Sequence, residues 1–219
     1  MVHYDYIEIG TSDFDTICQS SEPGAVGISM EPVAAYLHNL PDKLGNIKIE
    51  AALVPKHQAS QSIYWLPARA ILEYGLPKWL RGCNTLGAPH RSVIEYLKAH
   101  GLSESLLDSR HCKCMTPSEL VEQYQPGSIG VLKLDTEGMD SILVTAWAEL
   151  CKGSQAPLPE VVWWECNNLS TLAEIAAAQQ SLLDLGYELH HRNSVNCMMM
   201  RGFRKGTNIL HMLGISGVS

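Results

Sequence analysis

The spacing of two short apolar segments near the N-terminus constrains the fold of this chain more than any other feature. Residues 5–9 predict a buried strand that breaks at Gly10, and residues 25–30 predict a second strand that ends at Glu31. A glycine turn after a first strand lets backbone approach a ligand, and an acid after a second strand can accept hydrogen bonds from ribose hydroxyls. This layout is typical of a nucleotide-type cofactor site in a doubly wound α/β domain.

Strands and helices then alternate along the chain. We expect strands over 47–54, 130–135 and 160–165, helices over 32–40, 116–124, 139–152 and 169–185, and a terminal antiparallel pair over 187–191 and 196–200. Residues 55–111 interrupt this alternation with prolines, tryptophans and tyrosines. They are too long and too aromatic for a simple crossover, so we interpret them as a substrate-side insertion after strand three, holding one or two short helices. The pattern predicts an α/β fold with a mainly parallel sheet, an antiparallel C-terminal strand and a single domain over 1–219.

Composition narrows the class of partner. The chain has 219 residues, 16 basic and 23 acidic, for a formal charge of −7, which disfavours nucleic acid as a partner because phosphate binding needs a basic surface. No apolar run reaches the roughly 18–20 residues of a membrane span, and no secretory leader is visible. The seven cysteines are scattered. We therefore expect reduced thiols and a cytoplasmic location.

The glycine turn favours one kind of cofactor over another. A dinucleotide turn needs Gly-x-Gly-x-x-Gly, and only Gly10 of these three glycines is present, with Phe14 further along the turn. A pyrophosphate approaches backbone closely and depends on the missing small residues. S-adenosylmethionine tolerates the departure better, because it carries a ribose for Glu31 and an amino-acid tail for the turn but no phosphate. An NAD-dependent oxidoreductase is the weaker alternative.

Four segments together resemble the FkbM family of S-adenosylmethionine-dependent methyltransferases. They are 6–12, 27–37, 132–143 and 161–165, and the most specific of them contains Leu134-Asp135-Thr136-Glu137-Gly138. Gly82-Cys83-Asn84 is also similar to the substrate-side insertion of some members. The resemblance covers most of the chain, with Phe14 standing where the pattern usually has glycine. It implies a class I, Rossmann-like methyltransferase fold and O-methylation of a hydroxyl on a sugar or natural-product-like acceptor.

The resemblance also implies a set of cofactor-binding residues. The methionine end would lie against the first turn, the ribose against the acid after strand two, the adenine against the end of strand three, and the sulfonium near the acid after strand four. The residues in that order are Glu8, Gly10, Thr11, Ser12 and Asp13; Glu31, with Pro32 beside it; Ala52 and Leu53; and Asp135.

Candidate catalytic residues follow from the chemistry of methyl transfer. A hydroxyl is a poor nucleophile and needs a positioned base or a metal ion. Asp135 and Glu165 end neighbouring parallel strands, and with Asn167 they could bind Mg²⁺ through hard oxygen ligands. The alternative is that Asp135 and Glu137 cap the following helix. His90, in the insertion, is the other candidate base.

Two questions stay open at this level. Trp65, Trp79 and the nearby tyrosines are interpreted either as an acceptor-stacking surface or as the core of the insertion. The whole chain could also be a non-catalytic Rossmann-like binding module. The sequence does not identify the acceptor or the oligomeric state.

Overall fold

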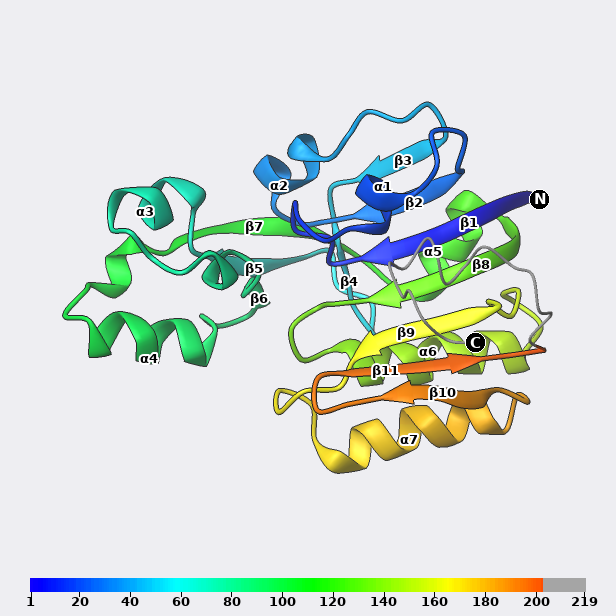
Figure 1. Ribbon diagram of the computed structural model, residues 1–219. Coiled ribbons are helices and arrows are strands. Elements are labelled where there is room, and N and C mark those ends of the chain that lie inside the picture. The colour runs from blue at the N-terminus through cyan, green and yellow to red at the C-terminus, as the bar shows by residue number, and fades with distance from the viewer. Residues whose placement is uncertain (203–219) are drawn as a thin grey trace.

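The structure, a computed structural model describing residues 1–202, is built on a seven-stranded sheet (Figure 1). Its strands lie in the order β10 (Glu188–Arg192), β11 (Asn196–Met200), β9 (Val161–Glu165), β8 (Pro126–Leu134), β1 (Val2–Ile9), β2 (Gly27–Met30) and β3 (Asn46–Ile49). The pairs from β9 to β3 are parallel, whereas β11 runs antiparallel to both β9 and β10. The predicted mainly parallel α/β sheet with an antiparallel C-terminal strand is confirmed.

Helices cover both faces of this sheet. On one face, α5 (Pro117–Tyr124), α6 (Asp140–Lys152) and α7 (Leu172–Leu183) pack against the sheet; α1 (Ile17–Ser20) and α2 (Ala34–Asn39) pack on the other. Ile7 belongs to the first core and its neighbour Tyr6 to the second, because successive strand side chains point to opposite faces. A strand buried on both faces reads as a nearly continuous apolar run. Among the helices of residues 1–202, none combines the length and apolarity that crossing a bilayer requires.

A second, smaller sheet occupies the predicted insertion. Its order is β4 (Ala52–Leu53), β7 (Asp108–Met115), β5 (Ser60–Trp65) and β6 (Thr85–Leu86), and it carries α3 (Ala68–Glu73), α4 (Arg91–Ala99) and the 3₁₀ helices η1 (Lys78–Arg81) and η2 (Glu104–Leu106). One or two short helices were expected, which α3 and α4 match, but the 3₁₀ helices and the strands were not expected. Residues 111–114 alternate between exposed and buried positions, the period of a half-buried strand.

The boundary of the predicted third strand was also wrong. The expected strand over 47–54 is divided: β3 ends at Ile49 in the main sheet, and β4 joins the second sheet by pairing Ala52 with Cys114. The N–H of Ala51 donates to the carbonyl of Ile49 at 3.1 Å, so the chain turns sharply between the two strands. The region built on the second sheet, called the inserted region below, therefore spans 52–115 rather than 55–111.

The inserted region is attached beside the carboxyl ends of the main strands (Figure 1). An apolar cluster joins α2 and its preceding turn to β4, β5 and β7. The hydroxyl of Tyr36, on α2, also donates to the carbonyl of Leu66 at 3.0 Å. The parallel strands β1, β2 and β8 point their last residues toward this region, which is where ligands bind in open α/β sheets.

Candidate functional site

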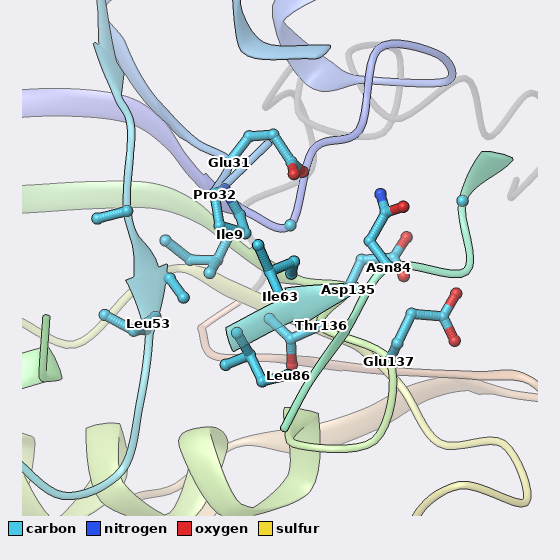
Figure 2. A pocket seen from close by; sticks show the side chains of 14 residues that line it. Ile9, Glu31, Pro32, Leu53, Ile63, Asn84, Leu86, Asp135, Thr136 and Glu137 are labelled. Atoms are coloured by element: carbon cyan, nitrogen blue, oxygen red, sulfur yellow. The ribbon is translucent and has the colours of Figure 1, made fainter. Parts of the chain in front are cut away.

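A cavity with about 420 Å³ of open space lies between the carboxyl edge of the main sheet and the inserted region (Figure 2). The lining residues are Ile9, Gly10, Glu31, Pro32, Ala51, Ala52, Leu53, Ile63, Gly82, Asn84, Leu86, Asp135, Thr136 and Glu137. The structure thus brings together six of the residues expected to bind a cofactor, namely Gly10, Glu31, Pro32, Ala52, Leu53 and Asp135.

Gly10 is required by the protein's own packing. Its φ is +75°, and a Cβ atom placed on it would lie 1.8 Å from the carbonyl oxygen of Asp135. The N–H of Gly10 donates to the carbonyl of Met30 at 2.9 Å, and the N–H of Asp135 donates to the carbonyl of Ile9 at 3.0 Å. The glycine therefore lets the ends of β1, β2 and β8 meet, in addition to exposing backbone to the cavity.

Glu31 presents a buried carboxylate at the end of β2. The residue is 2% exposed, and it accepts hydrogen bonds from the N–H groups of Ser12 at 2.8 Å and Val33 at 2.9 Å. Burial raises the pKa of Glu31 to about 7, although the two backbone donors oppose that shift. These donors fix the carboxylate at the cavity wall, and its remaining lone pairs can accept hydrogen bonds from a ligand.

Four other residues expected near the methionine end do not line the cavity. Glu8 is fully buried, where it accepts from the N–H of Ile17 at 2.9 Å and pairs with Lys133 at 2.8 Å. Asp13 is held by Arg81 and by Asn39. Thr11 and Ser12 are 3% and 7% exposed. Glu8 and Asp13 are therefore already neutralised by internal partners, and this part of the turn acts as support for Gly10 and Glu31.

Three carboxylates from two strand ends lie together at the other side of the cavity, where Asp135 and Glu137 line it and Glu165 does not. The side chains of Asp135, Glu137 and Glu165 place ligand oxygens within 4.8 Å of one another. Figure 2 shows Asp135 and Glu137 on one side with Asn84, and Leu53 on the opposite side. Burial raises the pKa of Asp135 to about 7, although the charge of Lys133 opposes that shift. Burial, reinforced by neighbouring carboxylates, raises the pKa of Glu165 to about 9. Within residues 1–202, the Oε2 atom of Glu165 is buried without a hydrogen-bond partner.

The helix-capping alternative for these acids is wrong. The N-cap residue of α6 is Met139, and it makes no side-chain cap bond. Asp140 holds the turn instead, because its carboxylate accepts from the N–H groups of Thr136 at 2.7 Å and Gly138 at 3.1 Å. Burial raises the pKa of Asp140 to about 6. Asp135 and Glu137 are therefore left facing the cavity.

The expected metal-ligand set changes in one member. The side-chain oxygen of Asn167 accepts from the N–H of Leu169 at 2.8 Å, and a side-chain hydrogen bond from Asn167 lowers the pKa of Glu165 against the effect of burial. Asn167 thus supports Glu165. The third carboxylate of the cluster is Glu137, so the geometry favours Asp135, Glu137 and Glu165 as oxygen ligands for a divalent cation.

His90 does not face the cavity as a free base. It is 7% exposed and forms the N-cap of α4, where its Nδ1 accepts from the N–H of Ser92 at 3.1 Å. Its Nε2 lies 3.3 Å from Oε2 of Glu137. Cys83 lies close to the same pair, and burial raises the pKa of its thiol to about 12.

The inserted region supplies lining residues that the strand pattern did not identify. Ile63, Gly82, Asn84 and Leu86 come from it. The signal available in the sequence was the Gly82-Cys83-Asn84 segment, which the family resemblance placed on the substrate side. Glu137 was visible within the specific motif after β8, but its role depended on where the helix cap lay. In comparisons with protein-family models, curated proteins and solved structures, no significant match to this chain was found.

Proposed function

We propose that this chain is an S-adenosylmethionine-dependent methyltransferase of the class I, Rossmann-like type, acting on a hydroxyl of a sugar or natural-product-like acceptor. The observation that carries the proposal is that Gly10, Glu31 and Asp135, from three separate strands, line one cavity. This is the arrangement that the resemblance to the FkbM family implies. The antiparallel β11 beside β9 is also consistent with that fold.

The charge of the cavity supports a cationic ligand. Glu31, Asp135 and Glu137 line it, and its described lining contains no lysine or arginine. A sulfonium and an ammonium group are attracted by this environment, whereas a pyrophosphate is repelled. Electrostatics therefore add to the missing glycines as an argument against an NAD-dependent oxidoreductase.

The two halves of the cavity suit the two ends of the donor. Ala52, Leu53, Ile63 and Leu86 offer an apolar surface for an adenine ring, and Glu31 lies where it can accept from ribose hydroxyls. Asp135 would then face the sulfonium end of the donor. When bound, the donor supplies a methyl carbon activated by positive charge on sulfur.

The protein's own contribution to the reaction is alignment and proton handling. Methyl transfer is an in-line displacement, so the walls of the cavity must hold the acceptor oxygen opposite the sulfur. The cluster of Asp135, Glu137 and Glu165 would hold the proton that the hydroxyl loses. The same three carboxylates fit Mg²⁺, which would instead lower the pKa of a bound hydroxyl.

Titration calorimetry tests the proposal directly. We expect heat of binding with S-adenosylmethionine and S-adenosylhomocysteine, and none with NAD. Glu188→Gln, an exposed change on the edge strand β10, should bind as the wild type does. Binding of NAD alone would replace the proposal with the oxidoreductase. Binding of S-adenosylmethionine without methyl transfer to a panel of glycosides and phenols would favour a non-catalytic module.

Metal binding by the acidic cluster can be measured separately from cofactor binding. Mn²⁺ should bind to the protein alone, and Glu137→Gln should weaken that binding more than Asn167→Ala, because only the former removes a carboxylate from the cluster. A larger loss of Mn²⁺ affinity in Asn167→Ala than in Glu137→Gln would restore the ligand set expected from the sequence.

A further inference from the structure

His90 is a buried titratable residue that the proposed reaction does not use. It belongs to the inserted region, and it faces Glu137, which belongs to the loop after β8 in the main sheet. The side chains are 6% and 15% exposed, respectively, and Nε2 of His90 lies 3.3 Å from Oε2 of Glu137. A side chain of the inserted region thus meets Glu137, a residue of the loop after β8 that lines the cavity.

The cap of α4 determines which nitrogen of His90 carries the ring proton. The N–H of Ser92 donates to Nδ1 at 3.1 Å. A backbone N–H can donate only to a nitrogen with a free lone pair, so the proton of the ring is on Nε2. A protonated Nε2 offers no lone pair to a metal ion or to an acceptor hydroxyl. This tautomer therefore removes His90 as a general base and as a metal ligand beside Cys83.

We propose that His90 is a positioning residue for Glu137. Its Nδ1 caps α4, and its Nε2 edge lies 3.3 Å from the Glu137 carboxylate, a close contact that keeps this carboxylate in the cluster with Asp135 and Glu165. The backbone of Glu137 is in the left-handed region, with φ of +53°. The Asp140 carboxylate accepts hydrogen bonds from the N–H groups of Thr136 and Gly138, on either side of Glu137. These bonds fix the backbone of Glu137 but not the direction of the Glu137 carboxylate, which lies against His90.

This assignment gives the inserted region a role besides lining the cavity. A residue at the start of α4 orients a carboxylate of the main sheet, so the position of the insertion is coupled to the geometry of the acidic cluster. The functional meaning of that coupling rests on the proposed function. The positions of the proton and of the carboxylate can be tested without any cofactor.

Two substitutions separate the two nitrogens of His90. His90→Asn keeps an oxygen close to the backbone, where asparagine is among the best N-caps, but its side chain is too short to reach Glu137. His90→Gln extends an amide toward the position of Nε2 and can donate to Glu137, but it is a poorer cap. We expect His90→Gln to lower Tm by about 2–4 °C through the lost cap, and His90→Asn to leave Tm close to that of the wild type.

Nuclear magnetic resonance can test both the position of the His90 ring proton and the effect of His90 on Glu137. In the wild type, the ¹⁵N shifts of His90 should show an unprotonated Nδ1 and a protonated Nε2. The amide resonances of Thr136 and Gly138, which flank Glu137, should move in His90→Asn and return toward wild-type positions in His90→Gln. A proton on Nδ1, or equal displacement of these amides in both variants, would overturn the proposal.

A titration of the wild type with S-adenosylmethionine keeps the two proposals apart. Failure of the wild type to bind the cofactor would sink the proposed function and leave the role of His90 as the resonances define it. Binding of the cofactor together with the wrong tautomer would sink only the role of His90.

Discussion

The carboxyl edge of the main sheet and the inserted region that faces it are built in different ways. At the edge, the non-glycine residues Ser12, Asp15 and Glu137 have positive φ values, and the carboxylates of Asp135, Glu137 and Glu165 place ligand oxygens within 4.8 Å of one another. In the inserted region, the described residues with positive φ are Gly75, Gly87 and Gly101. The ion pairs formed within it, such as Arg91 with Glu95, lie on the surface.

The difference bears on where the proposed reaction would take place. Positive φ at a non-glycine residue and the crowding of buried carboxylates each cost folding free energy, and they persist where surrounding structure compensates for them. The inserted region has neither feature, and its helices pack around an ordinary apolar cluster that includes Leu66, Leu80 and Leu97. We infer that the main sheet carries the reactive groups and that the inserted region shapes and closes the space around them.

The largest effect should come from Gly10. Gly10→Ala places a Cβ atom 1.8 Å from the carbonyl oxygen of Asp135, so the free energy of unfolding should fall by roughly 3 kcal/mol or more, as for other severe backbone clashes. Gly75→Ala is the matched control, because Gly75 also has positive φ but a Cβ there meets nothing within 4 Å. The control should cost only about 1–2 kcal/mol. Equal losses in urea unfolding would show that the strand ends are not tightly packed.

Glu31 should have the next largest effect, on binding. Glu31→Gln removes a charge and one acceptor oxygen from the cavity wall. The affinity for S-adenosylmethionine should fall by about 1.5–3 kcal/mol, roughly tenfold to a hundredfold. Calorimetry on this variant, beside Glu188→Gln, checks the expectation. An unchanged dissociation constant would remove Glu31 from the site and weaken the contrast between the two regions.

A smaller effect should appear in the pH dependence of stability. The pKa of Asp135 rises from 3.8 to about 7 on folding, mainly through burial. Between these values the folded state binds more protons than the unfolded state, so the free energy of unfolding falls as pH rises. Asp135→Asn should reduce the fall between about pH 5 and 8 by on the order of 1–2 kcal/mol. Denaturant unfolding across this range measures it, and an unchanged slope would mean that Asp135 does not titrate there.

The smallest effect should come from Phe14, at the contact between the two regions. Phe14 is 38% exposed, and its ring lies against Gly82 of the inserted region. It does not line the cavity. Phe14→Ala should change the affinity for S-adenosylmethionine by less than about 0.5 kcal/mol, as expected for a surface substitution. A larger loss in calorimetry would show that Phe14 shapes the cavity through Gly82.

The sequence by itself determined the parts of the fold that depend on local pattern. Buried parallel strands read as apolar runs, the capping box at Thr116 marks the start of α5, and Gly10 and Glu31 follow their strands at the spacing of a cofactor site. Because the carboxyl ends of parallel strands meet at one edge, these patterns also predicted that Gly10, Glu31 and Asp135 would lie together.

Only the tertiary structure decided which polar side chains pair with other groups inside the protein and which face the cavity. Glu8 and Glu31 were both expected to bind the cofactor. The structure pairs Glu8 with Lys133 inside the protein, whereas Glu31 lines the cavity. Glu137 joined the acidic cluster because Asp140, and not Glu137, braces the turn before α6. His90 presents its Nε2 to Glu137, since its Nδ1 accepts a hydrogen bond from the N–H of Ser92. Each outcome depends on a partner distant in the chain or on the geometry of one turn, and neither is encoded in hydrophobic periodicity.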